Sequence, residues 1–143
     1  MRTVLAYLST AVHIPKVIML VKIDTREKFY VITLNSTNIA ANMTATIKES
    51  LLPLLQTPVK NIVFRLKNIE SVEPAAAESL ASLQQFFYEN SASFIFCEIQ
   101  KPVEDFLEEQ GLLEIMNNTL TESEAWDIVQ MEEIERELLS DEE

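Results

Sequence analysis

Glycine, cysteine and histidine each occur once in this sequence of 143 residues, and each scarcity excludes a class of site. A single glycine, Gly111, cannot build a glycine-rich phosphate loop. His13 and Cys97 cannot make a Cys/His metal site, and a nucleophile in the body of the chain would have no histidine base. We therefore expect no enzyme activity, no metal and no cofactor. Cys97 lies in an apolar run, so we expect a small buried side chain, which is compatible with a reducing, cytoplasmic location.

Basic residues are also few, with 11 lysines and arginines against 23 aspartates and glutamates and a formal net charge of −12. Nucleic acids and anionic membrane surfaces bind clustered lysine and arginine, so we expect neither as a partner. Half of the excess lies in residues 131–143, which contain seven acidic residues and one arginine, a net charge of −6.

Long apolar runs are missing as well, because no run of 18 apolar residues occurs. The sequence therefore predicts no transmembrane helix and no direct membrane insertion. The apolar stretch 4–12 is preceded only by Arg2 and is interrupted by polar residues, so we do not expect a signal peptide. We interpret residues 1–18 as an N-terminal extension that is dispensable for folding.

The clearest pattern in the chain is a short apolar run followed by an amphipathic helix. Residues 62–66 are rich in β-branched and aromatic side chains, which predicts a strand covered on both faces. Residues 74–89 have helical periodicity, with Glu73 at the cap position and Pro74 at the first helical position, where its missing N–H costs nothing. The helix positions expected to face inward are Ala76, Leu80, Leu83 and Phe87, and those expected to face water are Glu78, Ser82, Gln85 and Glu89.

Before this unit, the sequence predicts a hairpin and a helix. Residues 19–34 contain two alternating segments joined by a polar turn, as in a β-hairpin. Apolar residues recur every fourth position over residues 39–51, which predicts a helix with Asn38 or Asn42 as its cap. Pro53 should break this helix near its end.

After it, the predicted elements continue to alternate. Residues 94–99 predict a strand, and Pro102 begins a helix that should end at Gly111 in the left-handed conformation. Gln110 is expected to face inward with the apolar residues of that helix. Residues 112–116 can form a short strand or extended segment, and residues 121–124, Thr-Glu-Ser-Glu, form a capping box before a last helix.

Strands that alternate with helices at this spacing predict a single α/β domain over residues 19–130. We expect a mixed, mostly parallel sheet of four to five strands packed with about four helices. Residues 131–143 are expected to form an acidic C-terminal helical tail. The apolar residues of the helix that starts after Thr121 advance mostly by three, so the stripe should wind around the helix and leave the body. Trp126 and Ile128 should reach the body, whereas Leu138 and Leu139 need not. The residues of the stripe are Ala125, Ile128, Met131, Ile134 and Leu138. We expect this helix to act as a docking element rather than as core.

The segment 66–76, Leu-Lys-Asn-Ile-Glu-Ser-Val-Glu-Pro-Ala-Ala, resembles the strand-turn-helix of sulfate transporter and anti-sigma factor antagonist (STAS) domains. In that family an apolar strand and a variable hexapeptide precede Asp-Ser-Ser/Thr-Gly at the helix start. The Gly-Leu pair after the predicted short helix is also similar to the family pattern. Here Glu73 stands in place of the Asp, Pro74 in place of the phosphorylatable Ser, and Ala76 in place of the Gly.

The resemblance implies a non-catalytic, cytoplasmic interaction module that binds a protein partner, an anti-sigma factor or kinase-like regulator. In the family, phosphate on the Ser releases the partner by placing a doubly charged group at the interface. Pro74 cannot accept phosphate, so the resemblance implies no phosphoacceptor and constitutive binding. The expected partner-binding residues are Glu70, Ser71, Glu73, Pro74, Ala75 and Glu78.

Two other functions remain open from the sequence. A STAS-like chain can be a structural subunit of a transport complex, or its crevice at the strand ends can bind a small ligand such as a nucleotide or a lipid. Glu73 can also be read simply as a helix cap, because a helix N-terminus favours negative charge.

Overall fold

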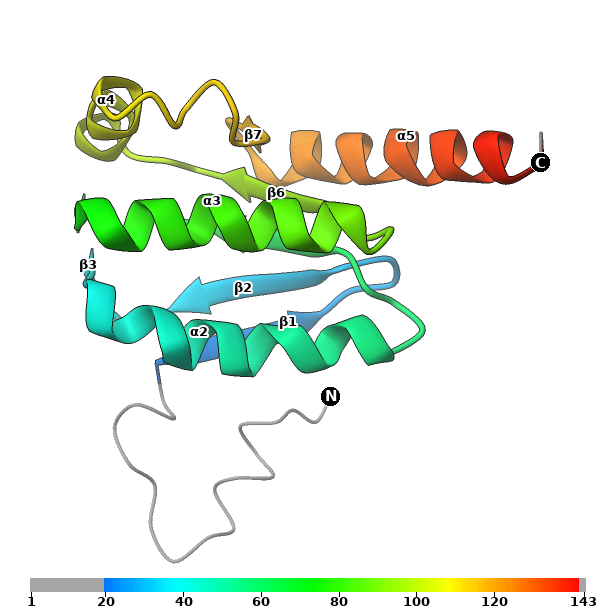
Figure 1. Cartoon of the computed structure of the whole chain (residues 1–143), viewed down its shortest axis with the longest axis horizontal. Coiled ribbons are helices and arrows are strands. Elements are labelled where there is room, and N and C mark those ends of the chain that lie inside the picture. Colours follow the sequence, from blue (N-terminus) through cyan, green and yellow to red (C-terminus); the bar gives the residue numbers. More distant parts are fainter. Residues whose placement is uncertain (1–19, 142–143) are drawn as a thin grey trace, which may run out of the picture.

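The computed structural model describes residues 20–141 and shows a five-stranded sheet with helices on both faces (Figure 1). This confirms the predicted α/β class. The N-terminal extension proposed over residues 1–18 and His13 lie outside the described residues. In chain order the elements are β1 (Val21–Thr25), β2 (Tyr30–Leu34), β3 (Asn38–Ile39), the 3-10 helix η2 (Ala41–Met43), α2 (Thr44–Leu51), the 3-10 helix η3 (Leu52–Gln56), β4 (Ile62–Arg65), β5 (Ser71–Val72), α3 (Pro74–Glu89), β6 (Phe94–Cys97), α4 (Lys101–Glu109), β7 (Asn118–Thr119) and α5 (Glu122–Asp141).

The main sheet has the strand order β1-β2-β4-β6-β7. β1 is antiparallel to β2, and every other neighbouring pair is parallel. The register places Val31, Val63 and Ile95 side by side on the three central strands. Because side chains alternate along a strand, this row points to one face and the next row points to the other. The mixed, mostly parallel sheet with a hairpin at one edge is confirmed.

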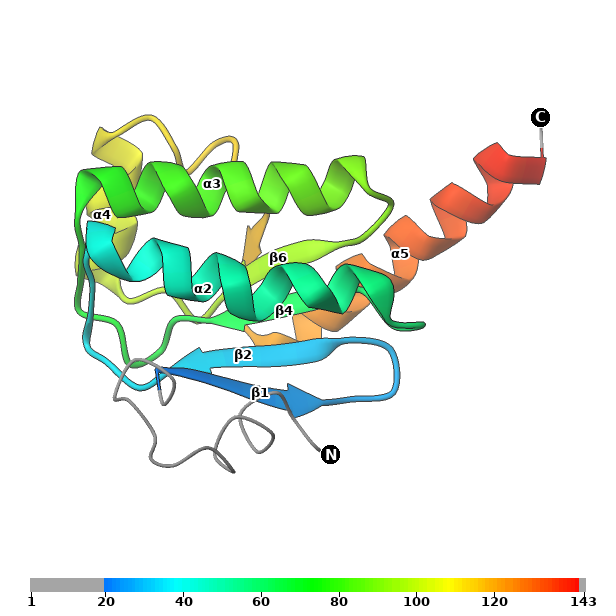
Figure 2. The same ribbon diagram turned by 60° about the horizontal axis from the view of Figure 1, so that its bottom comes forward.

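Different helices cover the two faces of the sheet (Figure 2). On one face, α2, α3 and α4 enclose the larger core cluster, which includes Phe64, Leu83 and Leu107. On the other face, Ala125 and Val129 of α5 pack against β2, β4 and β6 in a smaller cluster. β4 is therefore covered on both faces, as its continuous apolar sequence predicts.

α3 begins at the predicted residue, and its predicted inward-facing and water-facing positions are confirmed. Pro74 is its first residue, and Glu73 is the N-cap in an extended conformation. The four positions predicted to face inward are buried and the four predicted to face water are exposed. After Glu89 the chain turns through Ser91, whose φ is 66°, and enters β6.

The helix expected over residues 39–51 begins later than predicted. Ile39 belongs to β3, which pairs with β5 in a separate two-stranded ladder. Neither Asn38 nor Asn42 caps the helix; the side-chain oxygen of Asn38 accepts a hydrogen bond from Ser71 at 2.7 Å instead. The ladder uses the backbone groups of β3, so helical bonding starts only at η2. The break at Pro53 is confirmed, since α2 ends at Leu51 and the chain continues as η3.

α4 ends at Glu109, and Gly111 follows its C-cap with a φ of 72°, which confirms the predicted left-handed stop. The Leu112 N–H donates to the Leu107 carbonyl at 2.9 Å, which closes a Schellman motif. This closure turns the chain back on itself, so residues 112–116 form turns rather than the predicted strand, and the last strand is β7. Gln110 is exposed rather than inward-facing, because it is the C-cap of α4.

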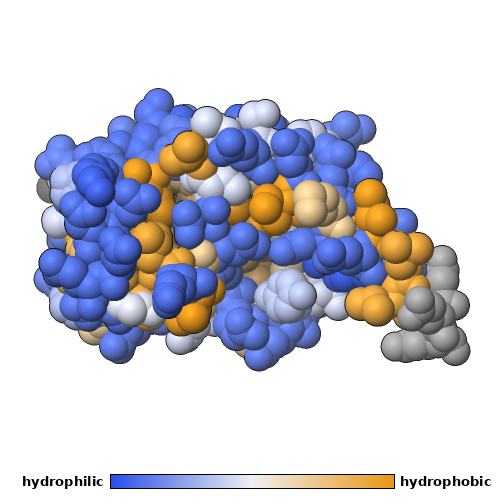
Figure 3. Space-filling view, turned by 90° about the horizontal axis from the view of Figure 1, so that it is seen from above, coloured by the Kyte–Doolittle hydropathy of each residue, from blue (hydrophilic) through white to orange (hydrophobic). Residues whose placement is uncertain are grey.

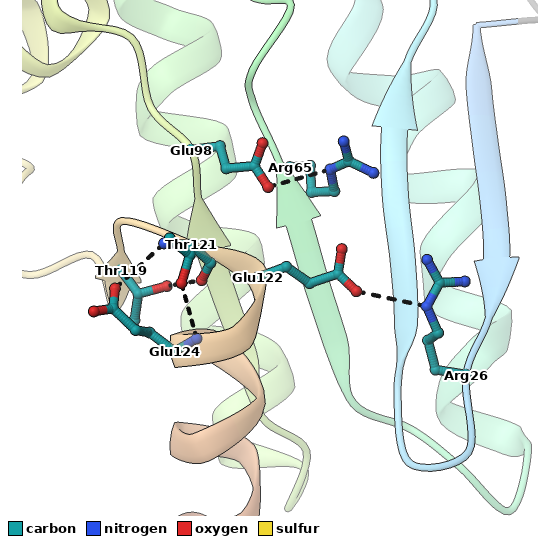
Figure 4. A network of polar contacts seen from close by, with 7 residues as sticks. All are labelled: Arg26, Arg65, Glu98, Thr119, Thr121, Glu122 and Glu124. Carbon is teal, nitrogen blue, oxygen red and sulfur yellow. Dashed lines mark hydrogen bonds and ion pairs between the residues drawn. The ribbon is translucent and has the colours of Figure 1, made fainter.

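α5 begins with the predicted capping box (Figure 4). The Glu124 N–H donates to Thr121 Oγ1 at 3.1 Å, and the Thr121 N–H donates to Glu124 Oε1 at 3.3 Å. Glu122 in the same turn lies 3.5 Å from Arg26 of the hairpin turn. A second ion pair joins the ends of β4 and β6. The start of α5 is thereby fixed over the second face of the sheet.

Only the first half of α5 packs on the sheet. Trp126 and Ile128 contact the body, as predicted, and the last apolar residues of the helix are exposed. Ala125 and Val129 are fully buried, so this half belongs to the core and is not the docking-only element that we expected. The second half projects beyond the sheet (Figures 1 and 2).

Candidate partner-binding surface

The predicted partner-binding residues lie on one continuous stretch, residues 66–78, which we call the β4–α3 segment. Three apolar side chains, Leu66, Ile69 and Val72, insert into the core and fix the path of this stretch. The polar residues between them point to solvent. All six predicted residues are exposed: Glu70, Ser71, Glu73, Pro74, Ala75 and Glu78.

The β3–β5 ladder holds the β4–α3 segment against residues 37–41. The Glu70 N–H donates to the Thr37 carbonyl at 2.6 Å, and the Glu73 N–H donates to the Ile39 carbonyl at 2.9 Å. The surface is therefore supported by backbone hydrogen bonds on both sides of Ser71. Such support lowers the conformational entropy that a partner would have to remove on binding.

The Glu73 carboxylate links two helix starts. It stands at the N-cap of α3, as predicted, but makes no side-chain bond to that helix. Instead, Glu73 Oε1 accepts a hydrogen bond from the Ala41 N–H at 2.8 Å. The longer glutamate side chain reaches past its own helix, whereas the short side chains preferred at N-caps fold back. Glu73 thus satisfies a free donor at the start of η2.

No hydroxyl is present at the first position of α3, because Pro74 stands there. The nearest serines in the sequence are Ser71 and Ser79. The Ser71 hydroxyl donates to Asn38, and Ser79 is half-buried on the side of α3 that faces α2.

A groove of about 630 Å³ runs between α2 and α3. Lys48 and Glu78 provide charges of opposite sign at its lining, and Phe86 exposes 46% of its surface there. Ala75 and Glu78 belong both to the groove and to the β4–α3 segment, so the two form one surface. Sequence reasoning missed the groove, although Phe86 offered a signal as a large aromatic residue outside the inward-facing stripe of α3. Its lining residues are Lys48, Leu52, Ala75, Glu78, Ser79, Ser82, Leu83 and Phe86.

A smaller hollow of about 340 Å³ lies where the strands end. Its lining is mostly polar and includes Ser36, Lys67, Gln100 and the predicted residue Glu70. The Gln100 side chain donates to the Lys67 carbonyl at 2.5 Å, which closes one wall. This hollow corresponds to the crevice at the strand ends that was one of the open alternatives, as a site for a small ligand. Its polar lining is unlike the predominantly apolar lining of most ligand pockets.

Cys97 is a buried structural side chain. It is fully buried in the cluster beneath α5, as expected from its apolar run. Burial, and secondarily the charge of Glu98, raises the pKa of the Cys97 thiol from 9.0 to about 12. A thiol in that state is not a nucleophile near neutral pH.

Residues 20–141 contain neither a metal-binding cluster nor a membrane-spanning helix. Within that range no group of three or more His, Cys, Asp or Glu side chains could hold a metal ion. None of the helices described there has the length and apolar character to cross a bilayer.

The sequence model of the STAS domain matches residues 21–125, so the chain belongs to the STAS domain family. This confirms the family that the strand-turn-helix resembles. No match was found among curated proteins.

Solved structures of anti-sigma factor antagonists share this fold. A candidate anti-sigma factor antagonist of Thermotoga maritima is 17% identical with a TM-score of 0.65, over 77% of this chain and 94% of that one. Unphosphorylated SpoIIAA of Bacillus is 16% identical with a TM-score of 0.61, over 77% of this chain and 96% of that one. A murine anion transporter of the Solute Carrier 26 family is 11% identical with a TM-score of 0.61; the match covers 76% of this chain but 18% of the transporter.

Proposed function

We propose that this STAS domain is a non-catalytic, cytoplasmic interaction module whose β4–α3 segment and α2–α3 groove together bind a protein regulator. The observation that supports this most is their continuity, because Ala75 and Glu78 belong to both. The partner is an anti-sigma factor or a kinase-like regulator of signal transduction and transcription. Phe86 supplies the exposed aromatic anchor that protein interfaces favour.

The binding is constitutive with respect to phosphate at the start of α3. SpoIIAA has been solved in both an unphosphorylated and a phosphorylated form. Pro74 has no side-chain hydroxyl to phosphorylate. The doubly charged group that would repel a partner therefore cannot form at this position.

Intact-mass analysis tests the absence of the switch. The purified chain is incubated with ATP, Mg²⁺ and a serine kinase that phosphorylates SpoIIAA, with SpoIIAA as the positive control. We expect no added phosphate on this chain. Stoichiometric phosphate on Ser71 or Ser79 would show that the family position has been assigned to the wrong residue.

Substitutions in the groove test the binding surface. Phe86→Ala should weaken the partner complex by about 2 kcal/mol, or roughly thirtyfold, if Phe86 is a hot spot. Tyr88→Ala is the matched control, because Tyr88 is an aromatic residue of the same helix that exposes 56% of its surface and lies outside the groove. Equal affinities for the two variants would argue against the groove.

The identity of the protein that this chain captures in an affinity pull-down distinguishes the proposal from a role in a transport complex. An ATPase with membrane-embedded subunits would favour a structural role in a transport complex, and a kinase-like regulator would favour signalling. A small-ligand function has one observation in its favour, since the groove volume lies within the range of about 300–1,000 Å³ typical of ligand pockets. Native mass spectrometry of the purified chain would detect a retained nucleotide or lipid.

A further inference from the structure

The second half of α5 carries an exposed apolar stripe. We call residues 131–140 the α5 overhang. Met131, Ile134 and Leu138 follow one another at steps of three and four and are 57%, 56% and 59% exposed. They lie on one side of the helix, and Leu139 widens the stripe with 62% exposure. Figure 3 shows apolar side chains gathered at this projecting end of the molecule.

The opposite side of the overhang is fixed to the body by polar contacts. Glu132 accepts hydrogen bonds from the Ser93 hydroxyl at 2.5 Å and from Asn117 Nδ2 at 3.1 Å. Glu133 Oε2 accepts a hydrogen bond from Asn61 Nδ2 at 2.7 Å. Arg136 donates to the Ser93 hydroxyl at 3.2 Å. We call these residues the α5 clamp; it binds the helix at the points where β4 and β6 begin.

The clamp gives the overhang a fixed direction and a preformed helix. An isolated segment of this length would be marginally helical in water. Here the packing of Ala125 and Val129 on the sheet and the clamp offset that ordering cost during folding. A partner would therefore meet the apolar stripe in its bound conformation, which favours affinity.

The charge of this end selects the kind of partner. Residues 131–143 have a net charge of −6, and the last turn of α5 contains no basic residue. Acidic side chains near a helix C-terminus are unfavourable, because that end of the helix carries partial negative charge. Lysine and arginine placed around the stripe would relieve both the mutual repulsion and this unfavourable interaction.

The same charge disfavours other occupants. A second copy of the chain would bring −6 against −6 around a small apolar contact. Anionic lipid surfaces and nucleic acids would be repelled for the same reason. An apolar groove rimmed by basic residues on a protein satisfies both the stripe and the charge.

We propose that the α5 overhang is a second docking element, whose Met131, Ile134 and Leu138 enter an apolar groove rimmed by lysine and arginine on a protein partner. This surface is separate from the one in the proposed function. The overhang shares no residue with the β4–α3 segment or with the lining of the groove, and α5 covers the opposite face of the sheet from α2 and α3 (Figure 2). One chain can thus hold two partners at once.

Site-specific photocrosslinking in the native cell tests the proposal on the full chain. A photoreactive phenylalanine analogue replaces Leu138, and after irradiation the crosslinked peptide is sequenced. We expect one protein adduct, at an apolar segment flanked by lysine or arginine. No adduct, an adduct to a second copy, an adduct to residues 1–18, or an adduct to a segment without basic residues would each overturn the proposal.

Matched variants then test the chemistry on the purified pair. The double variant Ile134→Ser/Leu138→Ser should lower affinity by about tenfold or more, whereas Leu120→Ser should not, because Leu120 is 76% exposed and lies outside the stripe. Glu135→Lys/Glu137→Lys should also weaken binding, whereas Glu108→Lys/Glu109→Lys on α4 makes the same change in net charge elsewhere. Equal effects of stripe and control variants would contradict the proposal.

Two further readouts keep the result separate from folding and from the proposed function. All of these substitutions are at exposed positions, so melting temperatures should agree within about 2 °C. Binding at the overhang should weaken when salt rises from about 50 to about 500 mM. The adduct should persist in Phe86→Ala, which removes the groove anchor; its loss there would show that the two surfaces are not independent.

Discussion

At the residue scale, Glu73 shows how one residue can join two elements that are far apart in the sequence. Its backbone caps and begins α3, while its carboxylate bonds the first N–H of η2. The β4–α3 segment and the start of η2 are therefore joined by a side-chain hydrogen bond. Substitution of Glu73 should disturb the surface as well as the stability.

We expect Glu73→Ala to lower the free energy of unfolding by about 1 kcal/mol, since the Ala41 N–H loses its acceptor. Glu73→Gln keeps a side-chain oxygen of the same reach and should retain most of the stability. Urea unfolding measures both, with Glu78→Ala as the control at an exposed position on the same helix. Identical losses for Ala and Gln would mean that the hydrogen bond to Ala41 contributes nothing.

The buried Cys97 thiol should make this protein less stable at alkaline pH. Its pKa is about 12 in the folded chain, against 9.0 for an ordinary thiol. Below pH 9 both states hold the proton, so the full stabilisation is present. Between pH 9 and 12 the unfolded chain loses the proton first, which favours unfolding.

We therefore expect the unfolding free energy of the wild type to fall relative to that of Cys97→Ala as the pH rises above 9. The comparison cancels the titration of the lysines and tyrosines that both proteins share. At pH 8 the native thiol should also resist alkylation and react only after denaturation. Rapid alkylation of the folded chain would show that the thiol is accessible.

At the element scale, the α5 clamp changes what truncation of the C-terminal helix should do. Asn61 is 4% exposed and Ser93 is fully buried, and both take partners from the second half of α5. A chain that ends at Gln130 keeps the apolar contacts of α5 but loses these partners. A chain that ends at Arg136 keeps both.

Truncation after Gln130 should therefore cost about 1–3 kcal/mol, because buried polar groups lose their hydrogen bonds. Truncation after Arg136 should change stability by less than about 0.5 kcal/mol, because residues 137–140 are exposed and take no part in the clamp. Differential scanning calorimetry of the two chains measures the contrast. If both melt with the wild type, the clamp is not formed in solution.

Features that are set by neighbouring residues could be predicted from the sequence, and features that join residues far apart in the chain could not. α3 was predicted because its proline start and its apolar stripe are properties of neighbouring residues. The β3–β5 ladder was missed, since strands of two residues have no periodicity and Ile39 fits a helical pattern. The clamp was missed because its polar partners are far apart in sequence; Asn61 and Glu133 are separated by 72 positions.

The candidate surface divides in the same way. Its six predicted residues are consecutive or nearly so, and the structure exposes all of them. The groove depends on how α2 lies beside α3, and no local pattern reports that placement. Phe86 was the one residue from which the groove could have been suspected.

At the scale of the whole molecule, the sheet and its two helical layers account for the described fold without the N-terminal extension. A chain that begins at Met19 should melt within a few degrees of the full chain. A loss above about 2 kcal/mol would show that Val4, Leu5 and Leu8 bury apolar surface against the body. The comparison also tests residues 1–18 as a cover for the α5 overhang, because their removal would then raise partner affinity.

The position of α5 at the end of the described fold has a consequence for synthesis. Among the described elements, α5 is the helix that covers the second face of the sheet, where Val31, Val63, Ile95 and Cys97 meet. A ribosome that adds about 5–20 residues per second needs about 1–4 s to make its 20 residues. Until α5 has folded onto the sheet, none of the other described helices buries this apolar face. Chains released before α5 is complete should aggregate or be captured by chaperones, because the second face of their sheet is left uncovered by the other described elements.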